Sequence, residues 1–150
     1  MVKKQEIKPY IGIDDIKLYS SLDEVISYLD NNNIKYEKST WSVEGETIPD
    51  PWTILEINNT MKIAFAKNNK CFEIVALEDY KGKLPNDICI GMNLDEALKL
   101  DKTISFEEFE EYYSSKKGYW FEDDLTTGKI ISITIYIKEI NDKDFDECKW

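Results

Sequence analysis

Two short stretches of this chain share a pattern that decides the fold: residues 15–26 read DIKLYSSLDEVI, and residues 87–98 read DICIGMNLDEAL. Five of the 12 aligned positions are identical, and three more pair aliphatic residues with each other. In each stretch a short apolar segment precedes a Ser or Asn, and a Glu follows three residues later, which is the pattern of a capped helix N-terminus. The repeated pattern therefore predicts two copies of a strand followed by a helix.

The residues after each cap follow the helical period. Four apolar residues of the first copy fall at i, i+3, i+4 and i+7: Leu22, Val25, Ile26 and Leu29. Three residues of the second copy repeat this spacing over a shorter length: Leu94, Ala97 and Leu98. Each helix is therefore expected to bury one apolar stripe, with Ser21 and Asn93 as caps and Glu24 and Glu96 completing the capping boxes.

Each copy then continues into residues with strand patterns. In the first copy, short Asn-containing connections separate the apolar runs 53–57, 61–66 and 72–77. Since Asn tolerates left-handed backbone, both connections favour tight hairpins. In the second copy, residues 119–122 lead through a turn at 125–128 into a longer run at 130–138.

The run 130–138 alternates strictly between two kinds of side chain. One side carries Ile131, Ile133, Ile135 and Ile137; the other carries Ser132, Thr134, Tyr136 and Lys138. Such alternation predicts an antiparallel strand with the isoleucines in the core and the second set facing water.

Two stretches leave alternatives open. Residues 31–51 contain Gly45, Pro49 and Pro51, and favour a long connection with one strand at 34–37. Residues 105–114 fit a helix with a Ser105/Glu108 capping box, and they fit an irregular edge strand equally well.

The chain is predicted to be a single α+β domain over residues 1–150, with internal repeats at about 10–80 and 84–140. We expect two strand-helix-strand repeats that form an antiparallel sheet, with the helices packed on one face.

Composition narrows the possible functions. The net charge is -11, the chain has no His, and all 19 basic residues are Lys. These counts exclude His-activated nucleophiles, imidazole metal ligands and guanidinium clamps. The acidic excess disfavours nucleic acid and anionic membranes, and it favours a basic protein partner.

Compartment is predicted from the cysteines and from apolar runs. The three Cys are an odd number without close spacing, which favours a reducing compartment. No apolar stretch follows Lys3 and Lys4, and no run approaches 18 apolar residues, so we expect neither a signal peptide nor a membrane span. The expected location is the cytoplasm.

The candidate partner-binding residues are acids interleaved with aromatics. The first group is Glu107, Glu108, Glu110, Glu111, Tyr112 and Tyr113, and the second is Trp120, Glu122, Asp123 and Asp124. An acidic rim around aromatic anchors suits a surface that binds a basic protein. The alternatives are an exposed element whose aromatics face the core, and a carboxylate pair of a hydrolase or a metal site.

No cofactor or metal site is predicted. Residues 142–147 alternate Asp with other residues in the manner of a calcium loop, but the sixth position is Glu147 where the EF-hand pattern needs Gly. No glycine-rich phosphate-binding motif occurs among the 6 Gly. These absences favour a protein that performs no chemistry.

The order of strand, capped helix and antiparallel strands, stated twice, resembles the tandem-repeat architecture of the β-lactamase inhibitor protein family. The matching segments are 16–29 with 61–77, and 88–98 with 119–137. We expect neither the disulfides nor the secretion signal of that family in this chain, so the resemblance does not imply its target.

In size, charge and aromatic content the chain also resembles small acidic bacterial immunity proteins, which neutralise a basic toxin domain inside the producing cell. This resemblance implies a non-catalytic protein inhibitor. The alternatives are a small adaptor or structural interaction module and, behind it, a carboxylate-dependent hydrolase.

Overall fold

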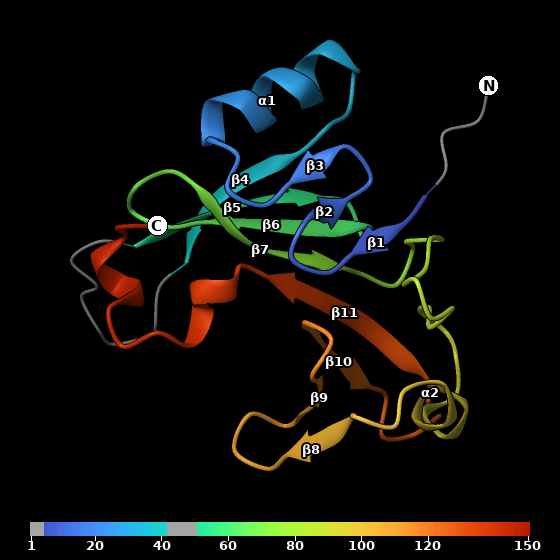
Figure 1. The fold of residues 1–150 in the computed structure, drawn as a ribbon. Helices are drawn as coiled ribbons and strands as arrows, with labels where there is room; N and C mark the ends of the chain where they lie inside the picture. The colour runs from blue at the N-terminus through green and yellow to red at the C-terminus, as the bar shows by residue number, and fades with distance from the viewer. Residues whose placement is uncertain (1–4, 42–50) are drawn as a thin grey trace.

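The computed structural model describes residues 5–41 and 51–150. Residues 1–4, and residues 42–50 of the expected long connection, lie outside the described residues. The fold is mixed α+β with antiparallel sheets, as predicted (Figure 1). It contains a three-stranded sheet, an eight-stranded sheet and two α-helices in the described part.

The small sheet consists of β1 (Ile7–Lys8), β2 (Gly12–Ile13) and β3 (Ile16–Lys17). Helix α1 (Leu22–Asn31) follows it, and helix α2 (Leu94–Leu100) lies between the two halves of the large sheet in the sequence. The large sheet has the strand order β4 (Glu37–Trp41), β5 (Trp52–Ile57), β6 (Met61–Phe65), β7 (Cys71–Ala76), β11 (Ile130–Tyr136), β10 (Tyr119–Asp123), β9 (Tyr112–Ser115) and β8 (Ser105–Glu107).

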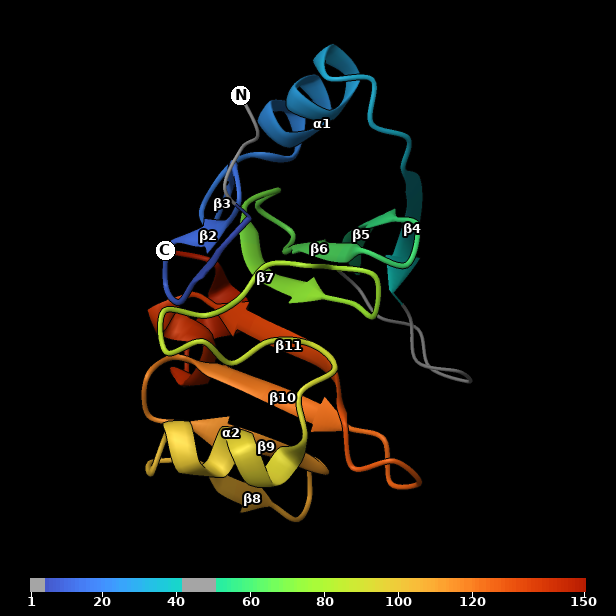
Figure 2. The same cartoon turned by 90° about the vertical axis from the view of Figure 1, so that its right-hand side faces the viewer.

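The large sheet therefore divides into two meanders that meet at β7 and β11 (Figure 2). These two strands run antiparallel and pair Thr134 with Val75, flanked by Ile133 with Ala76 and Ile135 with Ile74. Each of the two strands also carries one unpaired extra residue just after its start, a β-bulge at Phe72 in β7 and at Ile131 in β11.

Backbone hydrogen bonds tie the entry of each helix to the start of one central strand. For α1 they are Tyr19 N to Cys71 O at 2.8 Å, Cys71 N to Ser20 O at 2.8 Å and Leu22 N to Asn69 O at 2.8 Å. For α2 they are Gly91 N to Ile130 O at 2.8 Å, Ile130 N to Met92 O at 2.9 Å and Leu94 N to Gly128 O at 2.9 Å. Tyr19 and Gly91 also share a positive φ, of 70° and 90°.

The two predicted caps behave differently. Ser21 caps α1, because its hydroxyl oxygen accepts a hydrogen bond from the backbone N–H of Glu24 at 3.1 Å. Asn93 holds the N-cap position of α2 without such a bond, and its side-chain amide donates instead to Glu96 at 3.5 Å. The prediction of a capping side chain is therefore confirmed for Ser21 and wrong for Asn93.

The strands of the first half begin and end close to their expected positions. The exception is β4, which starts at Glu37, where the expected strand at 34–37 ends. Asn58 and Asn69 have φ of 42° and 59° in the hairpin connections, the left-handed backbone that Asn tolerates. The alternatives for 105–114 resolve as a hairpin, because β8 and β9 pair from Ser105 with Ser114 to Glu107 with Tyr112.

Strand β11 departs from the strict alternation in two ways. Ile131 is only partly buried, because it is the bulged residue, whereas Ile130 is buried. On the side expected to face water, Thr134 and Tyr136 are only 4% and 8% exposed. Large neighbouring side chains on the sheet surface cover them, so the prediction that both face water is wrong.

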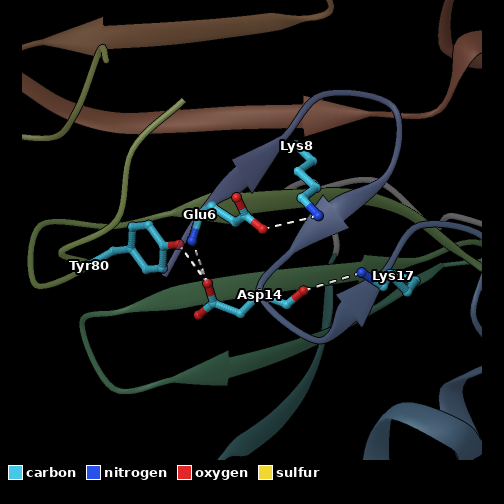
Figure 3. Close-up of polar contacts among 5 residues, drawn as sticks. All are labelled: Glu6, Lys8, Asp14, Lys17 and Tyr80. Atoms are coloured by element: carbon cyan, nitrogen blue, oxygen red, sulfur yellow. Dashed lines mark hydrogen bonds and ion pairs between the residues drawn. The ribbon is translucent and has the colours of Figure 1, made fainter. Parts of the chain in front are cut away.

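Polar contacts of Asp14 fasten the small sheet to the chain that follows β7 (Figure 3). One oxygen of the Asp14 carboxylate accepts hydrogen bonds from the Glu6 backbone N–H at 3.0 Å and from the Tyr80 hydroxyl at 2.8 Å. Burial and this acidic acceptor raise the pKa of Tyr80 above its ordinary value. Lys8 forms an ion pair with Glu6 at 3.0 Å next to these bonds.

Candidate functional site

The large sheet has two chemically distinct faces. Paired residues of an antiparallel sheet point to the same face, and successive residues of a strand alternate between faces. The core face carries fully buried apolar residues across both halves: Leu55, Ile63, Ile74, Ile135, Ile133 and Phe121. We call the opposite face the outer face.

An aromatic row crosses the outer face of the second half. Tyr112 on β9 stacks on Trp120 of β10, with ring centroids 4.6 Å apart and planes 3° apart. Trp120 in turn stacks on Tyr136 of β11 at 4.4 Å. Tyr10, between β1 and β2, meets Tyr136 edge-on at 6.1 Å. Tyr112 and Trp120 are both partly exposed, so this row offers ring surface to solvent.

Acids surround the aromatic row. Glu107 is paired with Tyr112, Glu122 follows Trp120 by two residues in β10, and Glu73 of β7 is paired with Tyr136. Glu107 and Glu122 are exposed, whereas Glu73 is partly buried and its burial raises its pKa to about 7. The partly exposed rings of the row and the acids around it give an aromatic and acidic surface.

The ionisation of the row's tyrosines reflects the same surroundings. Burial, followed by Tyr10 and Tyr112, raises the pKa of Tyr136 to about 12. Burial, followed by Glu110, Glu107 and Glu73, raises the pKa of Tyr112. Both rings therefore stay neutral at physiological pH and keep a hydroxyl that can donate a hydrogen bond.

The turn between β8 and β9 carries the other predicted acids. Glu108, Glu110 and Glu111 are exposed there, and Glu111 has a φ of 58°. Phe109 lies among them and is 100% exposed. This turn is therefore an acidic tip with an uncovered aromatic ring, next to the edge of the outer face.

Three of the predicted residues lie elsewhere. Tyr113 stacks on Phe121 at 5.3 Å and so belongs to the core face. Asp123 lies near Tyr113: burial, followed by the negative charge of Asp123, raises the pKa of Tyr113. Asp124 holds the β10–β11 turn, since its carboxylate accepts backbone hydrogen bonds from Thr126 at 2.7 Å and Thr127 at 3.3 Å.

Two important residues of the outer face, Tyr136 and Glu73, are not among the residues predicted from sequence. The alternation in β11 already placed Tyr136 on the face opposite the isoleucines, but it gave no sign that Trp120 lies beside it. That neighbour depends on the β10–β11 register, with Trp120 opposite Thr134. Glu73 joins the face through the long-range pairing of β7 with β11, which no local pattern reports.

A second aromatic cluster joins the first half of the sheet to the chain that follows β11. Phe72 contacts Trp52 at 4.8 Å and Phe145 at 5.4 Å, and Phe145 stacks on Trp150 at 5.5 Å. Phe145 lies in a short 3-10 helix, Phe145–Glu147, that follows another at Lys138–Asn141. The acidic segment 142–147 is thus anchored by one buried ring.

The buried carboxylate of Asp101 has a structural role. It is 1% exposed and accepts hydrogen bonds from Ser115 at 2.5 Å, Tyr119 at 2.6 Å and Thr103 at 2.7 Å. Burial alone would raise the pKa of Asp101, but these hydrogen bonds outweigh burial and hold it below its ordinary value. The carboxylate stays ionised and joins the end of α2 to β9 and β10.

Within residues 5–41 and 51–150, no three His, Cys, Asp or Glu side chains converge as a metal-binding group. No helix of the same residues is long and apolar enough to cross a bilayer. Comparison with known proteins finds no match for the chain among family models, curated proteins or solved structures.

Proposed function

We propose that this chain is a non-catalytic protein inhibitor, an immunity protein that neutralises a basic toxin domain by covering it with the outer face. The observation that carries the proposal is the aromatic row Tyr112–Trp120–Tyr136, bordered by Glu73, Glu107 and Glu122. Tyr112 and Trp120 of this row are partly exposed, and Tyr136 is buried beneath them. Tyr and Trp are the residues that most often supply binding energy at interfaces, and acids steer a basic partner onto them.

We also propose that the fold consists of two equivalent repeats, as in the β-lactamase inhibitor protein family that the sequence resembles. Three observations support this. The helix entries form matching hydrogen bonds, the bulges Phe72 and Ile131 occupy matching places, and the β7–β11 register is symmetric about Thr134 and Val75. Both helices would then pack on the same face of the sheet.

The repeats give a reason to regard the aromatic row as functional. By its register with β11, Trp120 corresponds to Lys62 of the first repeat, which pairs with Val75. By the same correspondence, Tyr112 matches Ile54. The fold therefore accommodates other residues at these places, so folding alone does not require the aromatic rings of the second repeat.

The alternatives receive less support from the geometry. A carboxylate-dependent hydrolase needs two acids facing one cleft. Here Glu122 borders the outer face, whereas Asp123 lies near Tyr113 on the core face and Asp124 accepts the backbone bonds of a turn. A plain adaptor module would use the same surface, and only the consequence of binding separates it from an inhibitor.

The test begins with capture of a partner from native lysate on the immobilised chain. The captured protein is then expressed with and without this chain. An inhibitor restores growth that the partner alone arrests, and the double variant Tyr112→Ala/Trp120→Ala loses the effect. Thr40→Ala, exposed on β4, is the control that keeps it. A captured partner that does not arrest growth contradicts the toxin-inhibitor function and favours the adaptor.

A further inference from the structure

The C-terminal segment, residues 138–150, covers the start of β7 in the first repeat. The bulged residue Phe72 contacts the ring of Phe145 at 5.4 Å and that of Trp150 at 6.4 Å, and Phe72 is fully buried. Trp150 also meets the ring of Tyr19, at the entry of α1, edge-on at 6.4 Å. The bulge and the helix entry of the first repeat are therefore covered by a segment that supplies two aromatic rings.

The covered cluster belongs to the outer face of the sheet. Trp52 contacts Phe72 at 4.8 Å and stacks on Trp41, its paired residue in β4, at 4.8 Å. Trp52 precedes the core residue Leu55 by three positions in β5, so the two side chains point to opposite faces. The C-terminal segment therefore covers part of the same face that carries the aromatic row.

The corresponding place in the second repeat is open. By the hydrogen bonds of the helix entries and by the bulges, Gly91 corresponds to Tyr19, and Ile131 corresponds to Phe72. Gly91 is exposed, and a Cβ added to it would meet no atom of the described residues within 4 Å. Ile131 is partly exposed, whereas Phe72 is fully buried. The second repeat therefore leaves uncovered what the first repeat covers.

Two further apolar side chains are exposed at this end of the sheet. Phe109 corresponds by strand register to Trp41 and is 100% exposed, and Leu125 of the β10–β11 turn is 95% exposed. Because neighbouring strands are antiparallel, the β8–β9 turn, the β10–β11 turn and the start of β11 lie at the same end of the sheet. We call Phe109, Leu125 and Ile131 the open end.

Charge decides which kind of segment fits the open end. Exposed carboxylates lie at the same end of the sheet: Glu108, Glu110, Glu111 and Glu122. The segment 138–150 contains five acids against three lysines, so the same segment of a second copy would be repelled there. A basic segment is attracted instead, and an aromatic side chain of that segment would bury apolar surface as Phe145 and Trp150 do on the first repeat.

We infer that the open end binds a basic segment of the protein partner and receives an aromatic side chain of that segment. The inference rests on the proposed function with its two repeats. It adds a second contact beside the aromatic row, since Tyr112 begins β9 at the same end of the sheet. The partner's segment takes the place that corresponds to the position of residues 138–150 on the first repeat.

The experiment is an NMR titration of the full ¹⁵N-labelled chain with a synthetic peptide. The peptide has the sequence of residues 142–150 with Lys in place of each acid and Ser in place of Cys148, so it keeps both aromatic rings and reverses the charge. The reporters are the backbone amides of Gly91 and Ile131. We expect saturable shifts of both amides in the native chain.

A matched pair of variants tests the contacts. Phe109→Ala/Leu125→Ala replaces side chains that are almost fully exposed, so the fold should be kept. This variant should bind the peptide at least about tenfold more weakly, because two apolar contacts are lost. Leu100→Ala, at an exposed apolar residue at the C-terminal end of α2, should bind as the native chain does.

Two further peptides separate the rings from the charge. With Ala in place of Phe and Trp, the basic peptide should bind at least about tenfold more weakly. The unchanged acidic sequence of residues 142–150 should not bind. Absence of binding to the native chain, or equal binding by the double variant or by the peptide without rings, overturns the inference. Equal binding of the acidic peptide also overturns it and favours a second copy. Since the peptide is not a toxin, the capture experiment decides the proposed function separately.

Discussion

Glu73 and Asp101 are two acids whose surroundings move their pKa values in opposite directions. Among residues 5–41 and 51–150, Glu73 is partly buried without a cation or hydrogen-bond donor that would favour its charge, whereas Asp101 is fully buried among three hydroxyl groups. A local pattern of residue types does not distinguish them, since each is one acid among many in this chain. Long-range packing decides their behaviour, and each gives a separate prediction.

Replacing Glu73 by Gln should stabilise the protein at neutral pH. The folded pKa is about 7 against an ordinary value of 4.5, so in this range the folded chain holds a proton that the unfolded chain releases. The free energy of unfolding therefore falls as pH rises from about 4.5 to 7. Glu73→Gln removes that loss, which is worth up to about 3 kcal/mol.

Urea unfolding of both proteins at pH 4.5, 6 and 8 measures this effect. The gain from Glu73→Gln should be greatest at pH 8 and nearly absent at pH 4.5. A gain that does not change with pH would contradict the prediction, as would the same profile from Glu56→Gln.

Replacing Asp101 by Ala should destabilise the fold by about 3 kcal/mol or more, because Ser115, Tyr119 and Thr103 lose a charged acceptor. The folded pKa is below the ordinary value, so the stabilisation is complete above about pH 4 and is lost as pH falls further. Thermal unfolding at pH 7 measures the cost. Asp142→Ala, at an exposed acid, should change stability by less than about 0.5 kcal/mol, and equal costs would contradict the structural role.

At the scale of elements, the two helices provide a matched pair. Ser21→Ala should cost about 1 kcal/mol, because it removes the hydrogen bond to the Glu24 backbone N–H. Asn93→Ala should cost clearly less, because the Asn93 side chain does not bond to the backbone of α2. Denaturant unfolding of both variants measures the difference. Equal costs would mean that the hydrogen bond between the Ser21 hydroxyl and the Glu24 backbone N–H does not add to stability.

The elements also show what the sequence could predict. The helices and most strands follow from spacing, since Leu22, Val25 and Leu29 are buried at helical intervals and Ile133 and Ile135 at strand intervals. The bulge at Ile131 could not be predicted from the sequence, because the alternating pattern is the same with or without a bulge. The sequence did not decide between a helix and a strand at 105–114, since Phe106, Phe109 and Tyr113 fit a helical period as well as a strand.

At the scale of the whole molecule, the same distinction applies to the candidate site. Tyr112, Trp120, Glu107 and Glu122 could be selected from composition because acids and aromatics cluster there. Tyr113 was selected for the same reason, yet it lies on the core face, because its position in β9 alternates with that of Tyr112. Only register separates the two tyrosines, and register is a property of the paired strands.

Association with a captured partner should depend steeply on salt. Exposed charges act over about 8–10 Å at physiological ionic strength, so added salt slows electrostatic encounter. Neutralising Glu107, Glu108, Glu110 and Glu111 together should slow association, whereas Tyr112→Ala should speed dissociation. Surface plasmon resonance separates the two rates, and circular dichroism melts check folding. Full affinity after all four neutralisations would mean that the acids only solvate the surface.

The two terminal strands of the large sheet affect whether the protein aggregates at high concentration. Strands β4 and β8 are the terminal strands of the sheet, and every residue in both is exposed. Unpaired edges are templates for pairing between copies, and mutual repulsion of chains with a net charge of -11 opposes such aggregation. Near the isoelectric point of about 4.5 that repulsion disappears. Light scattering should then show edge-to-edge aggregates at pH 4.5 and none at pH 7.5. The substitution Ser39→Pro in β4 should reduce the aggregation at pH 4.5. Equal scattering at both pH values would contradict the protective role of the net charge.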